Sequence, residues 1–95
     1  MSDKISSHVE FAQRLDQALA RMDQVVTEIP GDQALESVRL QLQGLKQWTR
    51  NGRKPEQAEK DRLNFGLLAS RYIHEFDSEL AGELYALASY VTYWE

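Results

Sequence analysis

Few side chains in this sequence have the spacing that acid–base or metal chemistry requires. The histidines, His8 and His74, belong to no spacing that presents two metal ligands from one helix, and cysteine is absent. The five glycines are too scattered to form a phosphate-binding loop. Glu79 and Glu83 have the spacing of a shared-proton pair or a hard-metal half-site, although solvated carboxylates on one helix face are far commoner. We therefore predict no catalytic residue, no metal site and no cofactor, and a protein that is not an enzyme.

Acidic and aromatic residues gather near the C-terminus. The chain has fifteen Asp and Glu against eleven Lys and Arg, a formal net charge of −4. Residues 72–95 hold five of the acids, none of the basic residues and six of the nine aromatics. Proteins that neutralise phosphates or lie on anionic lipid need the opposite charge balance. We expect neither nucleic acid nor a membrane as a partner.

This C-terminal segment has the composition of a protein interface, in which rings supply contact area and charges steer a complementary partner. On the last predicted helix, Tyr85 and Tyr93 face outward, while Glu79, Glu83 and Tyr90 share one flank. The candidate partner-binding residues are Glu75, Asp77, Glu79, Glu83, Tyr85, Tyr90 and Tyr93.

Four amphipathic segments must position these residues. Apolar residues recur in steps of three and four, which is typical of helices with one buried face. The expected starts and stops are a Ser7–Glu10 capping box, a stop at Pro30-Gly31, caps at Asp32 and Asp77, a left-handed turn at Asn51-Gly52, and Pro55 in the first turn of the third helix. The stripes are Phe11, Leu15, Ala18, Met22, Val25 and Ile29; Leu35, Val38, Leu42, Leu45 and Trp48; Phe65, Leu68, Ala69, Tyr72, Ile73 and Phe76; and Leu80, Leu84, Leu87 and Val91.

The third helix has a second stripe that includes Leu63, Leu67 and His74. Leu63 and Leu67 pack either on a neighbouring helix or on another chain. Gly66 and Gly82 each cost about 1 kcal/mol inside a helix, which predicts close helix approach at both positions. We expect an all-α, up-down antiparallel bundle of about four helices, forming one domain over residues 1–95 with residues 1–6 as a disordered tail. The N-terminus has no apolar run like that of a signal peptide, so we expect a cytoplasmic protein.

The run Arg62-Leu63-Asn64-Phe65-Gly66-Leu67-Leu68-Ala69, followed by the helix start Asp77-Ser78-Glu79-Leu80, resembles a family of small helical immunity proteins. That family neutralises NAD(P)+-glycohydrolase effectors of bacterial type VI secretion. The Pro30-Gly31 break followed by Leu35, Ser37, Gln41 and Leu42 is similar too, so the likeness spans about residues 11–91. The family pattern has a proline after the capping aspartate, where this chain has Ser78.

The resemblance implies an immunity protein that forms a one-to-one complex with a cognate secreted toxin. The toxin would be an NAD(P)+ glycohydrolase or another nucleotide-targeting effector, and the acidic, aromatic helical surface would cover its active-site region. A small helical adaptor, a secretion chaperone or a self-associating bundle is the alternative, and homo-oligomerisation stays open. The neighbouring gene distinguishes the two hypotheses, because a toxin-like domain encoded upstream favours immunity.

Overall fold

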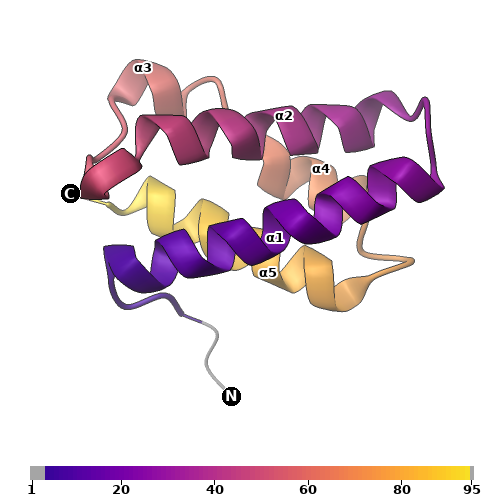
Figure 1. The fold of residues 1–95 in the computed structure, drawn as a ribbon, viewed down its shortest axis with the longest axis horizontal. Coiled ribbons are helices and arrows are strands. Elements are labelled where there is room, and N and C mark those ends of the chain that lie inside the picture. The colour runs from indigo at the N-terminus through magenta and orange to yellow at the C-terminus, as the bar shows by residue number, and fades with distance from the viewer. Residues whose placement is uncertain (1–3, 95) are drawn as a thin grey trace.

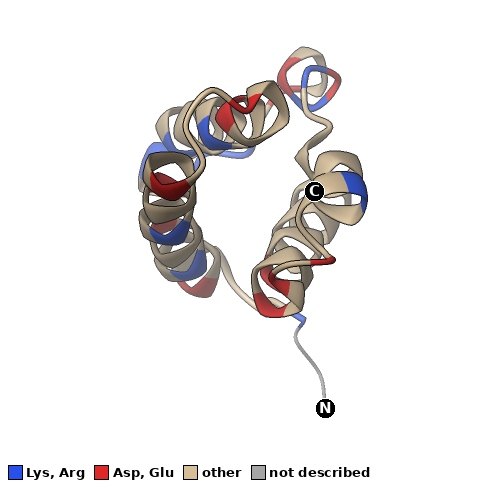
Figure 2. Cartoon of the chain, turned by 90° about the vertical axis from the view of Figure 1, so that its right-hand side faces the viewer, with Lys and Arg blue, Asp and Glu red and all other residues tan. Residues whose placement is uncertain are grey.

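The computed structural model describes residues 4–94, and these residues form helices and turns without a strand. The elements are α1 (His8–Glu28), α2 (Gln33–Trp48), a 3-10 turn (Arg50–Gly52), α3 (Gln57–Lys60), α4 (Phe65–Tyr72) and α5 (Ser78–Thr92). Successive long helices run in opposite directions (Figure 1). The end view shows them as a ring, in which α1 and α4 each contact both α2 and α5 (Figure 2). The predicted all-α antiparallel bundle is confirmed.

Side-chain caps fix the starts of α1, α2 and α5. Asp32 accepts a hydrogen bond from the Leu35 N–H at 3.1 Å, and the Ser7 hydroxyl accepts one from the Glu10 N–H at 3.2 Å. The Glu10 carboxylate turns back to the N–H of Ser6, not to that of Ser7. Only half of the predicted capping box therefore forms.

Left-handed residues end α1 and the α2 segment, as predicted. Gly31 has a φ of +85°, while Asn51 and Gly52 have φ values of +60° and +79°. Glycine and asparagine tolerate this region best among the residue types, so the chain reverses here with little strain.

The four long helices enclose one apolar core that contains no buried polar or charged side chain within residues 4–94. Three residues of the predicted stripes lie outside it, because Ile29, Tyr72 and Phe76 fall at or beyond the helix ends and are about half exposed. Ile5 is buried at 4% exposure. Ile5 therefore packs on the core although it falls in the predicted tail over residues 1–6, and residues 1–3 lie outside the described part. The larger fully buried side chains include Phe11, Leu15, Met22, Leu42, Leu45, Phe65, Ile73, Leu84 and Leu87.

The predicted third helix is divided in two. The chain leaves helical geometry at Asn64, whose φ is −141°. Gln41 on α2 holds it there, donating to the Asn64 side-chain oxygen at 2.6 Å and accepting from the Asn64 N–H at 2.8 Å. Pro55 is buried and lies one residue before the α3 cap, Glu56, instead of in the first turn. The break exists because α2 offers a competing partner for the Asn64 backbone.

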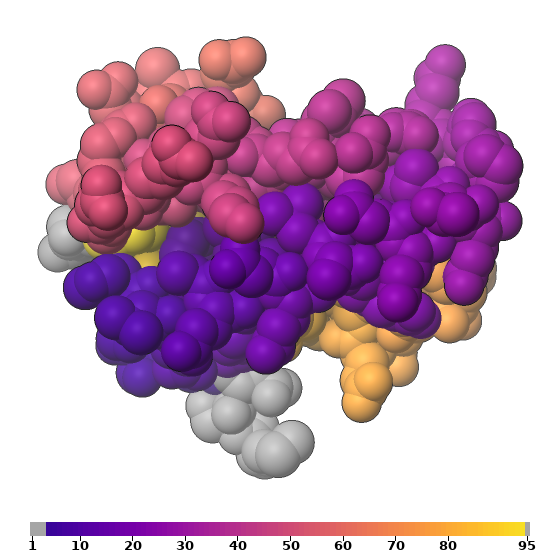
Figure 3. Space-filling model, viewed as in Figure 1, coloured from indigo at the N-terminus to yellow at the C-terminus, as the bar shows by residue number. Residues whose placement is uncertain are grey.

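The start of α5 is visible beside α1 on one face of the bundle. In the space-filling view α1 and α2 cover most of the visible face, and the start of α5 projects beyond α1 (orange in Figure 3).

No helix within residues 4–94 combines the length and apolar character needed to cross a bilayer.

Candidate partner-binding surface

The predicted partner-binding residues lie on the turn after α4 and along α5. Glu75 is in that turn, Asp77 is the N-cap of α5, and Tyr93 is its C-cap. The hairpin of α4, the turn and α5 therefore brings the predicted residues together, but these residues have different surroundings. Some bind other parts of this chain, and others face outward.

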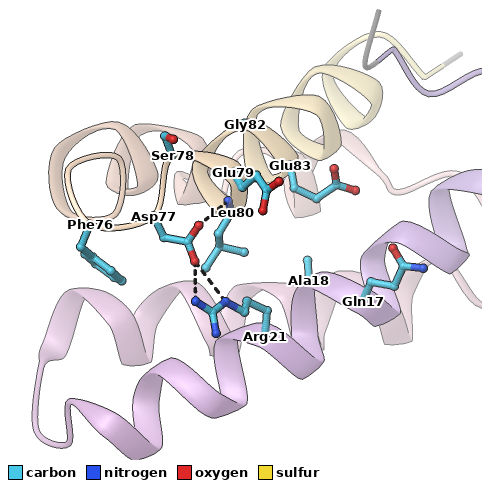
Figure 4. Close-up of a pocket in the computed structure, with 10 residues that line it drawn as sticks. All are labelled: Gln17, Ala18, Arg21, Phe76, Asp77, Ser78, Glu79, Leu80, Gly82 and Glu83. Carbon is cyan, nitrogen blue, oxygen red and sulfur yellow. Dashed lines mark hydrogen bonds and ion pairs between the residues drawn. The ribbon is translucent and has the colours of Figure 1, made fainter.

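Asp77 links the start of α5 to α1. Its carboxylate accepts from the Leu80 N–H at 3.0 Å and from the Arg21 guanidinium at 2.7 and 3.0 Å (Figure 4). The Leu80 N–H and then Arg21 hold the pKa of Asp77 below its usual value. Its side chain is 14% exposed, so Asp77 positions the helix and offers little surface to a partner.

Glu83 forms the second link between α5 and α1. Its two carboxylate oxygens accept from Arg14 Nε at 2.6 Å and Nη2 at 2.8 Å, a bidentate arrangement. These hydrogen bonds to Glu83 raise the pKa of Arg14. The interpretation of Glu79 and Glu83 as two solvated carboxylates is wrong for Glu83, because that flank of α5 faces α1.

Glu75 and Glu79 are the outward-facing acids of the set. Both are exposed, and neither makes a hydrogen bond or ion pair with another described residue. A carboxylate without an internal partner can form a charge-assisted bond to a second molecule without breaking one in the fold. The acidic part of the candidate surface therefore reduces to these two residues.

The three tyrosines also differ. Tyr90 is half-buried, with its ring stacked on Phe11 at a centroid distance of 5.0 Å and tilted against Trp94 at 5.1 Å. Tyr85 is 37% exposed and Tyr93 is 77% exposed, which confirms their predicted outward orientation. The rings of Tyr85 and Tyr93 are therefore accessible at the surface, whereas Tyr90 completes the packing of α5 on α1.

The structure adds Phe76 to this surface. Phe76 is 50% exposed and lines a hollow between α1 and the start of α5, together with Gln17, Arg21 and Glu79 (Figure 4). The helical spacing of the sequence predicts a buried position for Phe76 instead. Its position next to the capping Asp77 is the signal that could have shown it to lie past the helix end.

A second hollow follows the remainder of α5. Its lining includes Lys4 and Ile5 from the N-terminal segment and Tyr85, Ala86, Ser89 and Tyr93 from α5. Gly82 lines both hollows, so they adjoin along α5. The two hollows together are called the groove along α5, and its lining includes the small residues Gly82, Ala86 and Ser89.

The two interior glycines have different surroundings. A Cβ built on Gly66 would lie 3.2 Å from the Ala88 Cβ, so α4 and α5 approach closely there as predicted. A Cβ on Gly82 would have no atom within 4 Å. The prediction of close internal packing is wrong for Gly82, because this residue faces the groove.

The second stripe of the predicted third helix is only partly covered. Leu63 is half-buried against the core, which fits packing on a neighbouring helix. Leu67 is 53% exposed, and the exposed His74 ring lies 6.4 Å from that of Tyr85. Within residues 4–94, no three His, Asp or Glu side chains are grouped so that they could hold a metal ion.

The whole bundle has a counterpart among known protein families. Residues 10–92 match the family model Tsi6. The chain belongs to the Tsi6 family. Tsi6 proteins are immunity proteins of type VI secretion, directed against NAD(P)+-glycohydrolase effectors, and they are not a family of enzymes. This match confirms the resemblance found in the sequence.

The Tsi6 match extends from α1 to the end of α5 and includes every predicted partner-binding residue except Tyr93. Comparisons with curated proteins and with solved structures give no match. The family assigns the class of protein, and the contacts above separate the residues that hold α5 in place from those that face outward.

Proposed function

We propose that this chain binds a cognate secreted toxin in a one-to-one complex and inhibits it by covering its active-site region. The toxin is an NAD(P)+ glycohydrolase or another nucleotide-targeting effector. Membership of the Tsi6 family supports the immunity role. The outward-facing carboxylates of Glu75 and Glu79 are the observation that supports this surface as the one that binds the toxin.

Charge and aromatic area occur together on this surface. Glu79 lines the same hollow as the half-exposed ring of Phe76, Glu75 precedes Phe76 in the turn, and residues 72–95 contain no basic residue. An enzyme that binds nucleotide phosphates needs positive potential in its cleft. The two outward-facing carboxylates steer α5 and the turn before it toward that cleft, and the aromatic rings supply rigid contact area in the complex.

Internal ion pairs support this role by fixing the hairpin. The Arg21–Asp77 and Arg14–Glu83 pairs join α1 to α5 at two points. A surface held rigid before binding loses less conformational entropy when the complex forms. These four residues thus hold α5 in position on α1, whereas Glu75 and Glu79 contact the toxin.

Charge reversal tests the proposal on the cognate toxin domain, which is sought in the neighbouring gene. Glu79→Lys should lower the association rate constant about tenfold or more at low salt, and the difference should shrink as salt screens the charges. Asp61→Lys is the matched control, because Asp61 is an exposed acid after α3 and its substitution changes the net charge equally.

Stopped-flow association and residual NAD+ cleavage are measured together. Equal rate constants for Glu79→Lys and Asp61→Lys would show that the toxin binds elsewhere. A neighbouring gene for a structural secretion protein, combined with no binding to any toxin domain, would favour the adaptor or chaperone hypothesis instead.

A further inference from the structure

Gly82 stands apart from the other glycines of this chain. Gly31 and Gly52 have left-handed φ values, and Cβ atoms on Gly44 and Gly66 would meet Trp48 and Ala88 at 3.4 and 3.2 Å. Gly82 lies inside α5 without a positive φ and with open space where its side chain would be. Glycine destabilises a helix interior, and here no contact within the described residues accounts for it.

The open space above Gly82 is the centre of the groove along α5. Ala86 and Ser89 continue the floor toward the C-terminus, and the exposed rings of Tyr85 and Tyr93 stand along it. Glu79 lies at the other end. The α-helical rise places Glu79 and Tyr93 about 21 Å apart along the axis, which is enough for a helix of about 14 residues or a strand of about six.

We propose that a backbone segment of the toxin runs along α5 and passes directly over Gly82, with a basic side chain toward Glu79 and an apolar side chain between Tyr85 and Tyr93. This inference rests on the proposed function and names the part of the toxin that this surface binds. Close backbone approach is what an uncrowded glycine permits, because any side chain there would hold the partner away.

Charge determines the kind of segment that fits. Glu79 makes no hydrogen bond or ion pair with another described residue, and Arg21, whose pKa its charge helps to raise, is held by Asp77, so a basic residue gains a bond there. A second copy of this chain would instead bring another acidic α5 against it, since residues 72–95 contain no Lys or Arg. Like charges across an interface oppose association, so the Glu79 end of the groove fits a basic residue of a different protein, while the end lined by Lys4, Tyr85 and Tyr93 fits an apolar one.

Substitution of Gly82 separates this inference from the proposed function. Gly82→Leu fills the groove floor but improves helix propensity, so the variant should melt at or above the temperature of the natural chain. The dissociation constant of this variant for the proposed cognate NAD(P)+-glycohydrolase domain should rise about 100-fold. Ala20→Leu is the matched control, since Ala20 is exposed on α1 and should bind as the natural chain does.

Calorimetric titration of the three proteins against that domain gives distinct outcomes. If the natural chain and Gly82→Leu bind equally, the inference is overturned and the proposed function stands. If the natural chain itself does not bind, the proposed function fails first. If Gly82→Leu proves less stable than expected, Gly82→Ala replaces it, and a dissociation constant unchanged by that added methyl group would also overturn the inference.

Discussion

Replacement of Gly66 by leucine should destabilise the bundle through the contact between α4 and α5. A Cβ at this position would lie 3.2 Å from the Ala88 Cβ, whereas carbon atoms in favourable contact are about 3.5–4.0 Å apart. A single methyl group requires a shift of a few tenths of an ångström. Leucine adds three more carbons at a site where the helices already touch.

The expected loss follows from these distances. Overpacking of a closed contact costs about 1–3 kcal/mol. For a domain of this size that loss lowers Tm by roughly 4–24 °C. Gly66→Ala should stay within about 1 kcal/mol of the natural chain, because the gain in helix propensity of about 1 kcal/mol offsets the crowding.

Thermal unfolding followed by circular dichroism measures the effect, with Gly82→Leu as control. A Cβ on Gly82 meets no atom within 4 Å, so the same substitution there should leave Tm unchanged or raise it. If Gly66→Leu has the same Tm as the natural chain, or if Gly66→Leu and Gly82→Leu change Tm equally, the close approach of α4 and α5 is refuted.

Two further predictions concern the links between α1 and α5. The pKa of Asp77 is lowered in the folded chain, so its carboxylate contributes stability at neutral pH that is lost as the pH falls below about 4 through the lowered value. In urea unfolding between pH 6 and pH 2, the free energy of unfolding of Asp77→Asn should fall less steeply below pH 4 than that of the natural chain. An equally steep fall in both proteins would contradict a lowered pKa for Asp77. Glu83→Gln removes a carboxylate from Arg14 and should cost about 1–2 kcal/mol of unfolding free energy in urea titrations. Equal midpoints for Glu83→Gln and the natural chain would mean that the pair adds no stability.

Local signals explain why most helix boundaries could be predicted from the sequence. The caps at Ser7, Asp32 and Asp77 act on backbone groups within three residues, so their effect can be inferred from neighbouring residues alone. The division of the third helix depends instead on Gln41 and Asn64, which are 23 residues apart. A helical pattern continues through this region, and only the packing of α2 shows which partner the Asn64 backbone takes.

The candidate surface was predictable to a similar extent. Helical periodicity placed Tyr85 and Tyr93 outward because exposure follows from the position of the buried stripe. The pairing of Glu83 with Arg14 joins residues 69 apart, and periodicity gives no information on which helix faces that flank. The seven-residue separation of Arg14 and Arg21 on α1, close to that of Asp77 and Glu83 on α5, is the signal that points to paired flanks.

Inhibition of the toxin at defined stoichiometry tests the central claim most directly. The purified chain is titrated into the proposed cognate NAD(P)+-glycohydrolase domain, and residual NAD+ cleavage is followed at toxin concentrations far above the dissociation constant. We expect cleavage to fall linearly and reach its minimum at one equivalent, and Glu79→Lys to lose inhibition where Asp61→Lys retains it. Cleavage that continues unchanged in the presence of excess natural chain would contradict the account.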